Sequence, residues 1–214
     1  NMSGLASLDV GGKLAVTGSA TLPSGTTVAG TLAGPGTATL PAGATGSLGA
    51  CSELSGLTLV NDGSLTDAAD NSCSGYPFAS SAVLQNAGTL TMPDGADLET
   101  DGTAGNQLIN QAAGTITYPG GSQGAIIDVP VTQDGTIRAG SGHGALQVQV
   151  TGGSGSPLLS GQGTIDLTGT ATLPAGVSVS GLAHLAVGGS VTVGSLNMSG
   201  LASLDVGGKL AVTG

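Results

Sequence analysis

Acidic side chains gather in one short stretch of this chain, and carboxylates bind hard cations and carry out acid–base chemistry. Asp97, Glu99 and Asp101 alternate along the sequence and lead into Gly102, which resembles the opening of a calcium-binding loop. Such a loop closes with a glutamate, whereas position 108 is Leu. The stretch therefore predicts either a weak calcium site or a solvated acidic turn, and no other metal or cofactor is expected.

Paired carboxylates can also hydrolyse polysaccharides, and Asp94, Asp97 and Asp128 are the candidates for that chemistry. Other catalytic patterns are missing from the sequence, including H-E-x-x-H, G-x-S-x-G and metal-spaced Cys and His residues. With only three basic residues, a polysaccharide lyase is disfavoured. We therefore expect that the protein is not an enzyme and keep a polysaccharide-binding or polysaccharide-degrading protein as the alternative.

The elements that must position these residues are short strands. Gly or Pro interrupts nearly every window of ten residues, which leaves little room for helices. Many short stretches instead alternate apolar and polar residues, as in Leu146–Val150. The 214 residues include only three aromatics, so the core must be narrow and filled by Leu, Val, Ile and Ala. A charged fraction of 7% and a positive mean hydropathy argue against disorder.

Short internal repeats indicate how these strands are organised. The pattern G-[ST]-x-T-[LMY]-P-x-G occurs five times, starting at Gly18, Gly36, Gly88, Gly114 and Gly169. Repeating units of about 18–28 residues, each with two or three short strands, are typical of the rungs of a β-solenoid. The sequence therefore predicts an all-β parallel β-helix with about nine or ten rungs in 196 residues, roughly 43–48 Å long.

Asparagines recur just before the repeated glycines, at Asn61, Asn86 and Asn110. In a solenoid, such residues can point inward and stack their amides into a hydrogen-bonded ladder. They can equally occupy left-handed turn positions, which asparagine tolerates well. The sequence leaves both interpretations open.

The N-x-G-[ST]-[LI] phrases, as in Leu84–Leu90, resemble the repeats of secreted bacterial β-helix adhesins of the filamentous haemagglutinin kind. The resemblance is clearest over Leu57–Leu167. It implies a right-handed parallel β-helical shaft outside a bacterial cell. No receptor-binding motif carries over from the family.

Cys51 and Cys73 are the only cysteines and lie 22 positions apart, which is close to one rung. Equivalent positions on neighbouring rungs are ~4.8 Å apart, within the range that a disulfide spans. We therefore predict a disulfide between them, with two buried thiols as the alternative. A disulfide favours an extracellular or otherwise oxidising location.

The last 18 residues, 197–214, repeat residues 1–18 without a difference, a period of 196 residues. This predicts one complete module at 1–196 and the start of an identical module at 197–214, through tandem repetition or deliberate duplication. Residues 1–18 resemble a rung whose inward side chains are Leu5, Leu8, Val10, Leu14 and Val16. The predicted seam between modules is marked by Asn1, Gly18, Leu196, Asn197 and Gly214.

Neither end of the chain offers a capping segment, and an uncapped solenoid exposes strand edges and an open core. End-to-end continuation, either covalent or between separate subunits, would bury both. We therefore expect a structural module of a long extracellular fibre or cell-surface stalk, with adhesion to a surface receptor or glycan as an extension. The partners are expected to be copies of the chain itself, joined end to end and bundled laterally.

Charge and hydropathy limit the other classes of binding partner. The net charge of −10 excludes an ordinary nucleic-acid-binding surface, which is basic. No stretch approaches the ~20 apolar residues of a membrane span. Ice binding is a further alternative, because Thr-x-Thr recurs at Thr37/Thr39, Thr89/Thr91, Thr115/Thr117 and Thr170/Thr172. The uneven spacing of these pairs argues against an uninterrupted threonine ladder.

Overall fold

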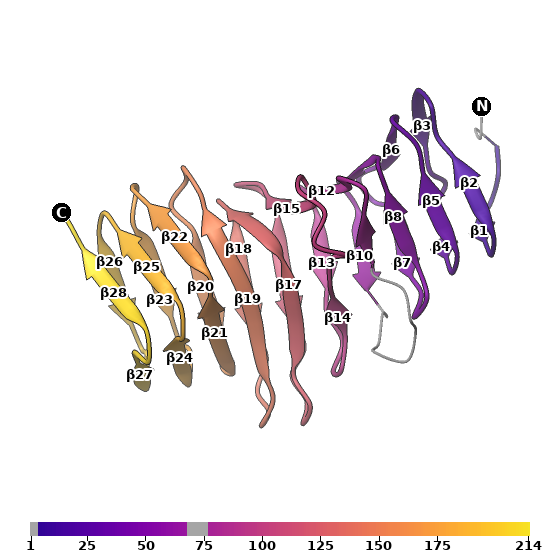
Figure 1. Cartoon of the computed structure of the whole chain (residues 1–214). Coiled ribbons are helices and arrows are strands. Elements are labelled where there is room, and N and C mark those ends of the chain that lie inside the picture. Colours follow the sequence, from indigo (N-terminus) through magenta and orange to yellow (C-terminus); the bar gives the residue numbers. More distant parts are fainter. Residues whose placement is uncertain (1–3, 68–76) are drawn as a thin grey trace.

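The computed structural model describes residues 4–67 and 77–214, and this part of the chain is an all-β parallel solenoid of about ten turns. No helix occurs in the described residues. Figure 1 shows the turns stacked from one end of the molecule to the other, with the two termini at opposite ends. The predicted fold class and number of rungs are confirmed.

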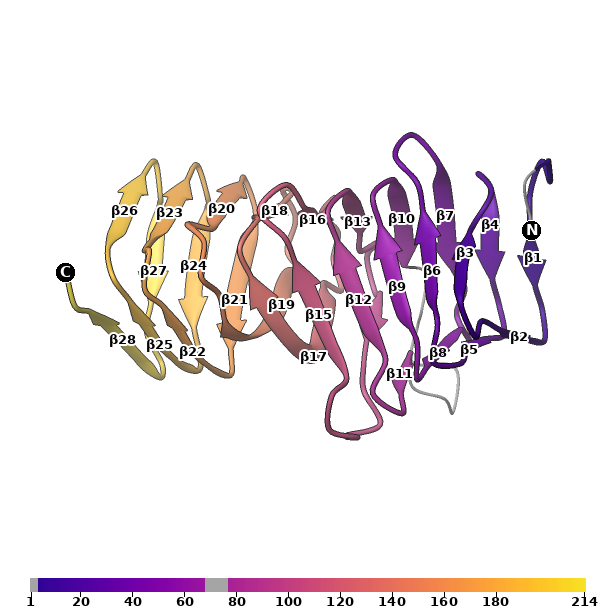
Figure 2. The same ribbon diagram turned by 90° about the horizontal axis from the view of Figure 1, so that it is seen from above.

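Each turn begins in a ten-stranded parallel sheet, which we call the first sheet and which forms one row in Figure 2. Its strands are β1 (Asp9–Val10), β4 (Thr26–Val28), β7 (Thr45–Leu48), β10 (Ser64–Asp67), β13 (Thr89–Thr91), β16 (Thr115–Tyr118), β18 (Thr136–Ala139), β20 (Leu158–Gly161), β23 (Val177–Ser180) and β26 (Leu196–Ser199).

Three further sheets complete the turns. An eleven-stranded sheet contains β3 (Ser19–Thr21), β6 (Thr37–Leu40), β9 (Thr58–Asn61), β12 (Val83–Asn86), β14 (Asp97–Leu98), β15 (Gln107–Asn110), β17 (Ala125–Gln133), β19 (Ala145–Gly152), β21 (Thr164–Thr168), β24 (His184–Val187) and β27 (Ser203–Asp205). A four-stranded sheet contains β2 (Lys13–Ala15), β5 (Thr31–Ala33), β8 (Glu53–Ser55) and β11 (Phe78–Ala79), and a three-stranded sheet contains β22 (Thr170–Leu173), β25 (Ser190–Val193) and β28 (Lys209–Val212).

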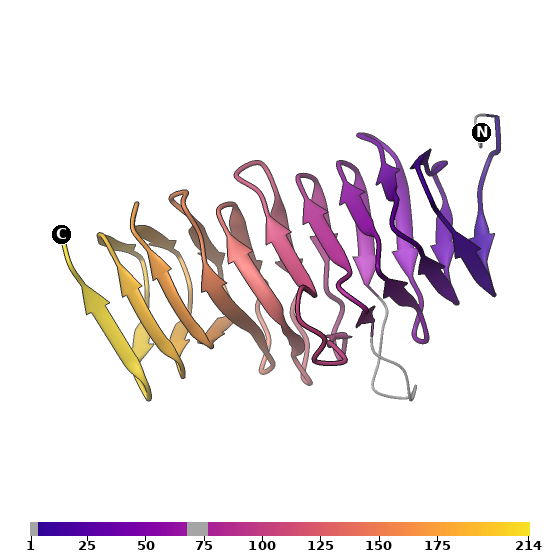
Figure 3. The ribbon, with the colours of Figure 1, turned by 45° about the horizontal axis from the view of Figure 1, so that its top comes forward.

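A turn therefore consists of a first strand in the first sheet, then a second and a third strand. The first turn is β1, β2 and β3, and the last is β26, β27 and β28. The long strands β17 and β19 each fill both the second and the third position of their turns. Figure 3 shows that the turns keep one orientation along the molecule while the loops at their corners vary in length.

All strand pairs are parallel, and nearly all are in uninterrupted register. Paired residues of the first sheet lie 18 positions apart between Asp9 and Thr27 and 26 positions apart between Thr91 and Thr117. The turns therefore differ in loop length but not in their strand positions. This agrees with the spacing of the sequence repeats.

The core runs along the axis as stacked columns of apolar side chains. One column of the first sheet consists of Leu65, Leu90, Ile116, Ile137, Leu159 and Val179. These side chains are at most 5% exposed. The two aromatic residues of the described chain, Phe78 and Tyr118, are fully buried in the same core. Leu, Val and Ile columns fill a narrow interior, as the composition predicts.

The recurring asparagines form an inward amide ladder at the ends of the third strands. Asn61 Nδ2 donates to Asn86 Oδ1 at 2.7 Å, and Asn86 Nδ2 donates to Asn110 Oδ1 at 2.8 Å. Asn110 Nδ2 donates to Gln133 Oε1 at 3.1 Å, and Gln133 Nε2 ends the ladder on the Gly135 carbonyl at 2.9 Å. All four side chains are at most 1% exposed. Of the two interpretations left open by the sequence, the ladder is therefore correct.

The glycines that follow these amides lie where the backbones of successive turns nearly touch. A Cβ atom added at Gly88 would overlap the carbonyl oxygen of Gly63, and one at Gly114 would overlap the carbonyl oxygen of Asn86. Both backbones are held there by hydrogen bonds between turns, such as Thr89 N to Gly63 O at 2.8 Å. The repeated glycine therefore reflects close stacking of the corners.

Candidate interface at the two ends of the solenoid

The two terminal turns expose apolar side chains, whereas the flanks of the solenoid hardly do. Among the described residues, the exposed large hydrophobic side chains are Leu5, Ile126, Met198, Leu204, Val206 and Val212. Leu5 belongs to the first turn and the last four belong to the final turn. Only Ile126 lies on a flank, in β17. Exposed apolar surface that gathers in one place is typical of an association site.

The final turn also exposes strand edges. Within the described chain, β26 pairs only with β23, β27 only with β24, and β28 only with β25. Each of these strands therefore presents a row of backbone groups on its outer edge, and such a row is a template for another strand. Met198, Leu204, Val206 and Val212 are 47%, 40%, 41% and 51% exposed beside these edges.

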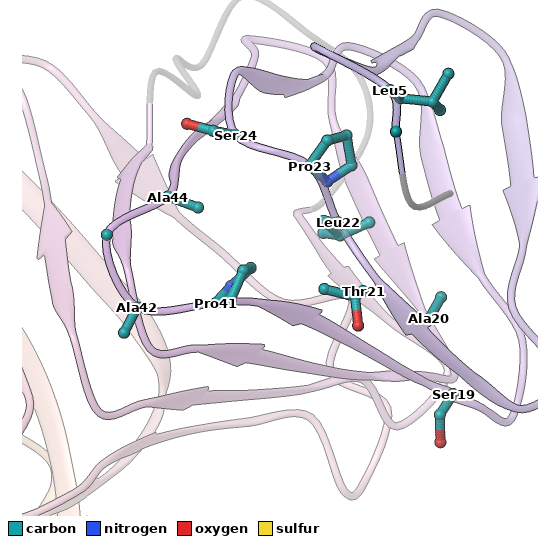
Figure 4. A pocket seen from close by; sticks show the side chains of 12 residues that line it. Leu5, Ser19, Ala20, Thr21, Leu22, Pro23, Ser24, Pro41, Ala42 and Ala44 are labelled. Atoms are coloured by element: carbon teal, nitrogen blue, oxygen red, sulfur yellow. The ribbon is translucent and has the colours of Figure 1, made fainter. Parts of the chain in front are cut away.

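The opposite end is hollow. A cavity of about 880 Å³ is lined by Gly4 and Leu5, by residues 19–24 and by residues 41–44. Figure 4 shows Leu5 on one side of this cavity, Leu22 and Pro23 in the middle, and Pro41 and Ala44 on the other side. The lining mixes small apolar side chains with the hydroxyl groups of Ser19, Thr21 and Ser24. The first turn therefore borders an open surface of mixed polarity.

The predicted inward residues of the first turn are confirmed with one correction. Val10 and Val16 are each 6% exposed, and Leu8 and Leu14 are partly buried against the core. Leu5 is wrong as a core residue, because it is 50% exposed. It lines the open cavity beside residues 19–24 instead of entering the core.

The predicted seam residues fall at both ends of the molecule. Gly18 lies in the first turn between β2 and β3. Leu196 and Asn197 lie in β26, and Gly214 follows β28 in the final turn. Asn1 lies outside the described residues. The described seam residues therefore lie in the two terminal turns, and their role as a seam stays a prediction.

The predicted carboxylates separate into three environments. Asp97, Glu99 and Asp128 line a shallow hollow of about 380 Å³ together with Gln147 and Gln149. Burial raises the pKa of Glu99, and the nearby charge of Asp97 raises it further. In the described part of the chain, no group of three or more Asp, Glu, His or Cys side chains is arranged to hold a metal ion. The calcium site at Asp97, Glu99 and Asp101 remains a prediction without geometric support.

The carboxylate of Asp101 forms hydrogen bonds within its own loop. Its Oδ1 accepts from Thr103 N at 2.8 Å and from Asn106 Nδ2 at 2.6 Å, and its Oδ2 accepts from the Thr103 hydroxyl at 2.7 Å. These bonds, with the backbone N–H of Thr103 foremost, lower the pKa of Asp101. Its carboxylate therefore serves as a loop cap.

Asp94 lies apart from the other carboxylates and joins two turns. Its Oδ1 accepts from the Tyr118 hydroxyl, Gln123 N and Gly124 N, each at 2.9 Å, and its Oδ2 accepts from Ser122 N at 3.0 Å. The Ser122 bond is the main reason that the pKa of Asp94 falls to about 2. Sequence analysis missed this role, although the glycines at 120, 121 and 124 are a signal of a tight loop that can surround an anion.

The structure describes only one of the two cysteines of the predicted disulfide. Cys51 is an exposed residue after β7, and Cys73 lies outside the described residues. The pairing of these two cysteines therefore stays a prediction.

Hydroxyl side chains form two parallel rows on the outside of the first sheet. Pairing in register aligns Thr45, Ser64, Thr89, Thr115 and Thr136 in one row and Thr27, Ser47, Thr66, Thr91 and Thr117 in the other. Ser64 interrupts the threonines of the first row and Ser47 those of the second, whereas the hydroxyl groups continue through five turns in each row. The pairs Thr37/Thr39 and Thr170/Thr172 lie in other sheets.

No family model, curated protein or solved structure matches this chain. Among the described residues, no helix is long and apolar enough to cross a membrane. The function must therefore be argued from the solenoid and its surfaces.

Proposed function

We propose that this chain is a structural module of a long extracellular fibre or cell-surface stalk, in which the solenoid of one copy continues into the next. The supporting observation is that five of the six exposed large hydrophobic side chains of the described chain lie on its two terminal turns. Those turns carry the same 18-residue sequence. Exposed apolar side chains that gather mainly at the two ends favour growth along the axis.

The rest of the molecule suits a shaft. Its flanks carry few charges, and its core is continuous from the first turn to the last. The resemblance of its repeat phrases to filamentous haemagglutinin-like adhesins points to the same use and to a location outside a bacterial cell. Adhesion to a receptor or glycan would be an added property of the corner loops.

End-to-end association of the purified chain tests the proposal. Sedimentation velocity over a range of concentrations is expected to show elongated oligomers for the natural sequence. Leu204→Lys combined with Val206→Lys places two charges on the final turn and is expected to weaken association at least tenfold, about 1.4 kcal/mol. Ile126→Lys is the matched control, because it removes the exposed hydrophobic side chain of the flank. Equal effects of the end and flank variants would contradict the proposal.

Ice binding is a second candidate, favoured by the two rows of Thr and Ser hydroxyls on the first sheet. Hydroxyl groups within one row lie ~4.8 Å apart along the axis, and the two rows lie roughly 6.6 Å apart along the strand. These spacings form a regular lattice that suits ordered water. Thr91→Lys with Thr117→Lys would disrupt it, whereas Thr39→Lys on another sheet serves as control. Inhibition of ice recrystallisation that is lost only in the first variant would support this function, and no inhibition by the natural chain would dismiss it.

A further inference from the structure

The duplicated segment occupies two different places within a turn. In the first copy, described from residue 4 to residue 18, Asp9 lies in β1, the first strand of its turn. In the second copy, the corresponding Asp205 lies in β27, the second strand of its turn, after β26. The two copies are identical in sequence but offset by one strand.

This offset fixes the length of the repeat in turns. The ten strands of the first sheet, from β1 to β26, are separated by nine complete turns. The 196 residues from Asp9 to Asp205 therefore span nine turns and one further strand of three, or about 9⅓ turns, with neighbouring turns stacked like adjacent strands of a sheet. The repeat is not a whole number of turns.

The two copies also show which strands pair with the segment on each of its two sides. The first copy is covered by the following turn at an offset of 18 residues, with Asp9 paired to Thr27 and Lys13 paired to Thr31. The second copy rests on the preceding turn at an offset of 19 residues, as in the pair of Leu204 with Leu185. Each copy uses the strand edges that the other leaves open. One segment can therefore hold both neighbours without a change of register.

The two copies of the segment differ in how deeply their valine side chains are buried. Val10 and Val16 are each 6% exposed. The next turn covers both, because Val10 pairs with Val28 and the Val16 N–H donates to the Ala33 carbonyl. Their counterparts Val206 and Val212 are 41% and 51% exposed. Since the sequences are identical, the difference arises from the covering turn. Residues 205–211 are thus complementary to residues 27–33, which cover the identical residues 9–15 in the first copy.

We propose that residues 19–33 of a second module cover the final turn, and that successive modules are therefore shifted by one strand position around the axis. Thr26–Val28 of the next module would lie over β27, and Thr31–Ala33 would lie over β28. Ser19–Thr21 would lie over β26 and continue the first sheet. This inference rests on the proposed function, because it describes the junction within a fibre.

The shift determines how an array presents its surfaces. The hydroxyl rows of the first sheet would move to the next side of the rod with each module and return to the same side after three modules. A corner loop would likewise be displayed on all three sides in turn. A fibre built in this way presents the same surface to partners approaching from any direction.

A chain of two modules, residues 1–214 followed directly by residues 19–214, tests this geometry. Asp205→Cys in the first module and Thr27→Cys in the second are predicted to be neighbours, ~4.8 Å apart and within disulfide range. Asn197→Cys with the same Thr27→Cys is the matched control, because these positions are neighbours only if the repeat is a whole number of turns. Peptide mass spectrometry after mild oxidation measures both cross-links, and cryo-electron microscopy of the unsubstituted two-module chain gives the strand order independently.

We expect the Asp205–Thr27 cross-link to exceed the Asn197–Thr27 cross-link at least tenfold. The reverse ratio would overturn the one-strand shift and leave the fibre proposal standing. Two separate solenoids without either cross-link, seen as a flexible pair by microscopy, would overturn the junction and the fibre proposal together.

Discussion

A ladder of buried amides runs through the middle of the solenoid. Asn86 donates to Asn110 and to the Thr115 carbonyl and accepts from Asn61, so it takes part in three hydrogen bonds inside an apolar core. A buried donor or acceptor left without its partner costs ~1–3 kcal/mol. The ladder thus ties successive turns together and also fixes their register.

Asn86→Leu is expected to lower the free energy of unfolding by about 2–4 kcal/mol, because it leaves groups on both neighbouring turns without partners. Asn61→Leu should cost less, since Asn61 ends the ladder and its Oδ1 already has no partner. Gln85→Ala is the control, because Gln85 lies on the outer face of the same strand. Chemical denaturation monitored by circular dichroism measures all three, and equal losses for Asn86 and Gln85 would contradict the ladder's role.

The carboxylate of Asp94 makes the stability of the folded state depend on pH. Its pKa is lowered from 3.8 to about 2, chiefly by the Ser122 N–H, so the folded state favours the charged carboxylate. The stabilisation is complete above about pH 4 and is lost as the pH falls through about 2. Asp94→Asn should therefore flatten the decline of the melting temperature in this range, whereas Asp62→Asn at an exposed corner should not. An unchanged decline in Asp94→Asn would show that other groups cause it.

At the scale of the elements, the corner glycines decide how closely the turns stack. Gly88→Ala is expected to destabilise the solenoid by about 1–3 kcal/mol, since the new Cβ would overlap the Gly63 carbonyl and force the turns apart. Gly152→Ala is a matched control, because nothing lies within 4 Å of its added Cβ. Thermal unfolding compares the two variants. An unchanged melting temperature for Gly88→Ala would mean that the corners can move apart without a loss of stability.

The strands and their stacking could be predicted from sequence because they repeat. Alternating apolar residues, Gly and Pro at corners and the recurring Asn all carry a local signal. The position of Asp94 against residues 122–124 could not be predicted, since those residues are 28 to 30 positions away and show no pattern of their own. The hydroxyl rows were missed for a related reason, because turns of unequal length conceal which Thr and Ser residues align.

At the scale of the whole molecule, the exposed large hydrophobic side chains of the described residues gather on the two terminal turns rather than on the flanks. The duplicated sequence indicated that the two terminal turns are related. Their one-strand offset could not be predicted, because identical sequences give no information about their position within a turn. The offset emerges only from which sheet each copy joins.

Electron microscopy of the native material shows whether the chain forms part of a continuous rod. If the chain is a module of a continuous solenoid, the material should consist of long, thin rods with an axial repeat of about 45 Å, the length of about 9⅓ turns at ~4.8 Å each. Compact particles of a single chain, with no axial repeat, would contradict the account.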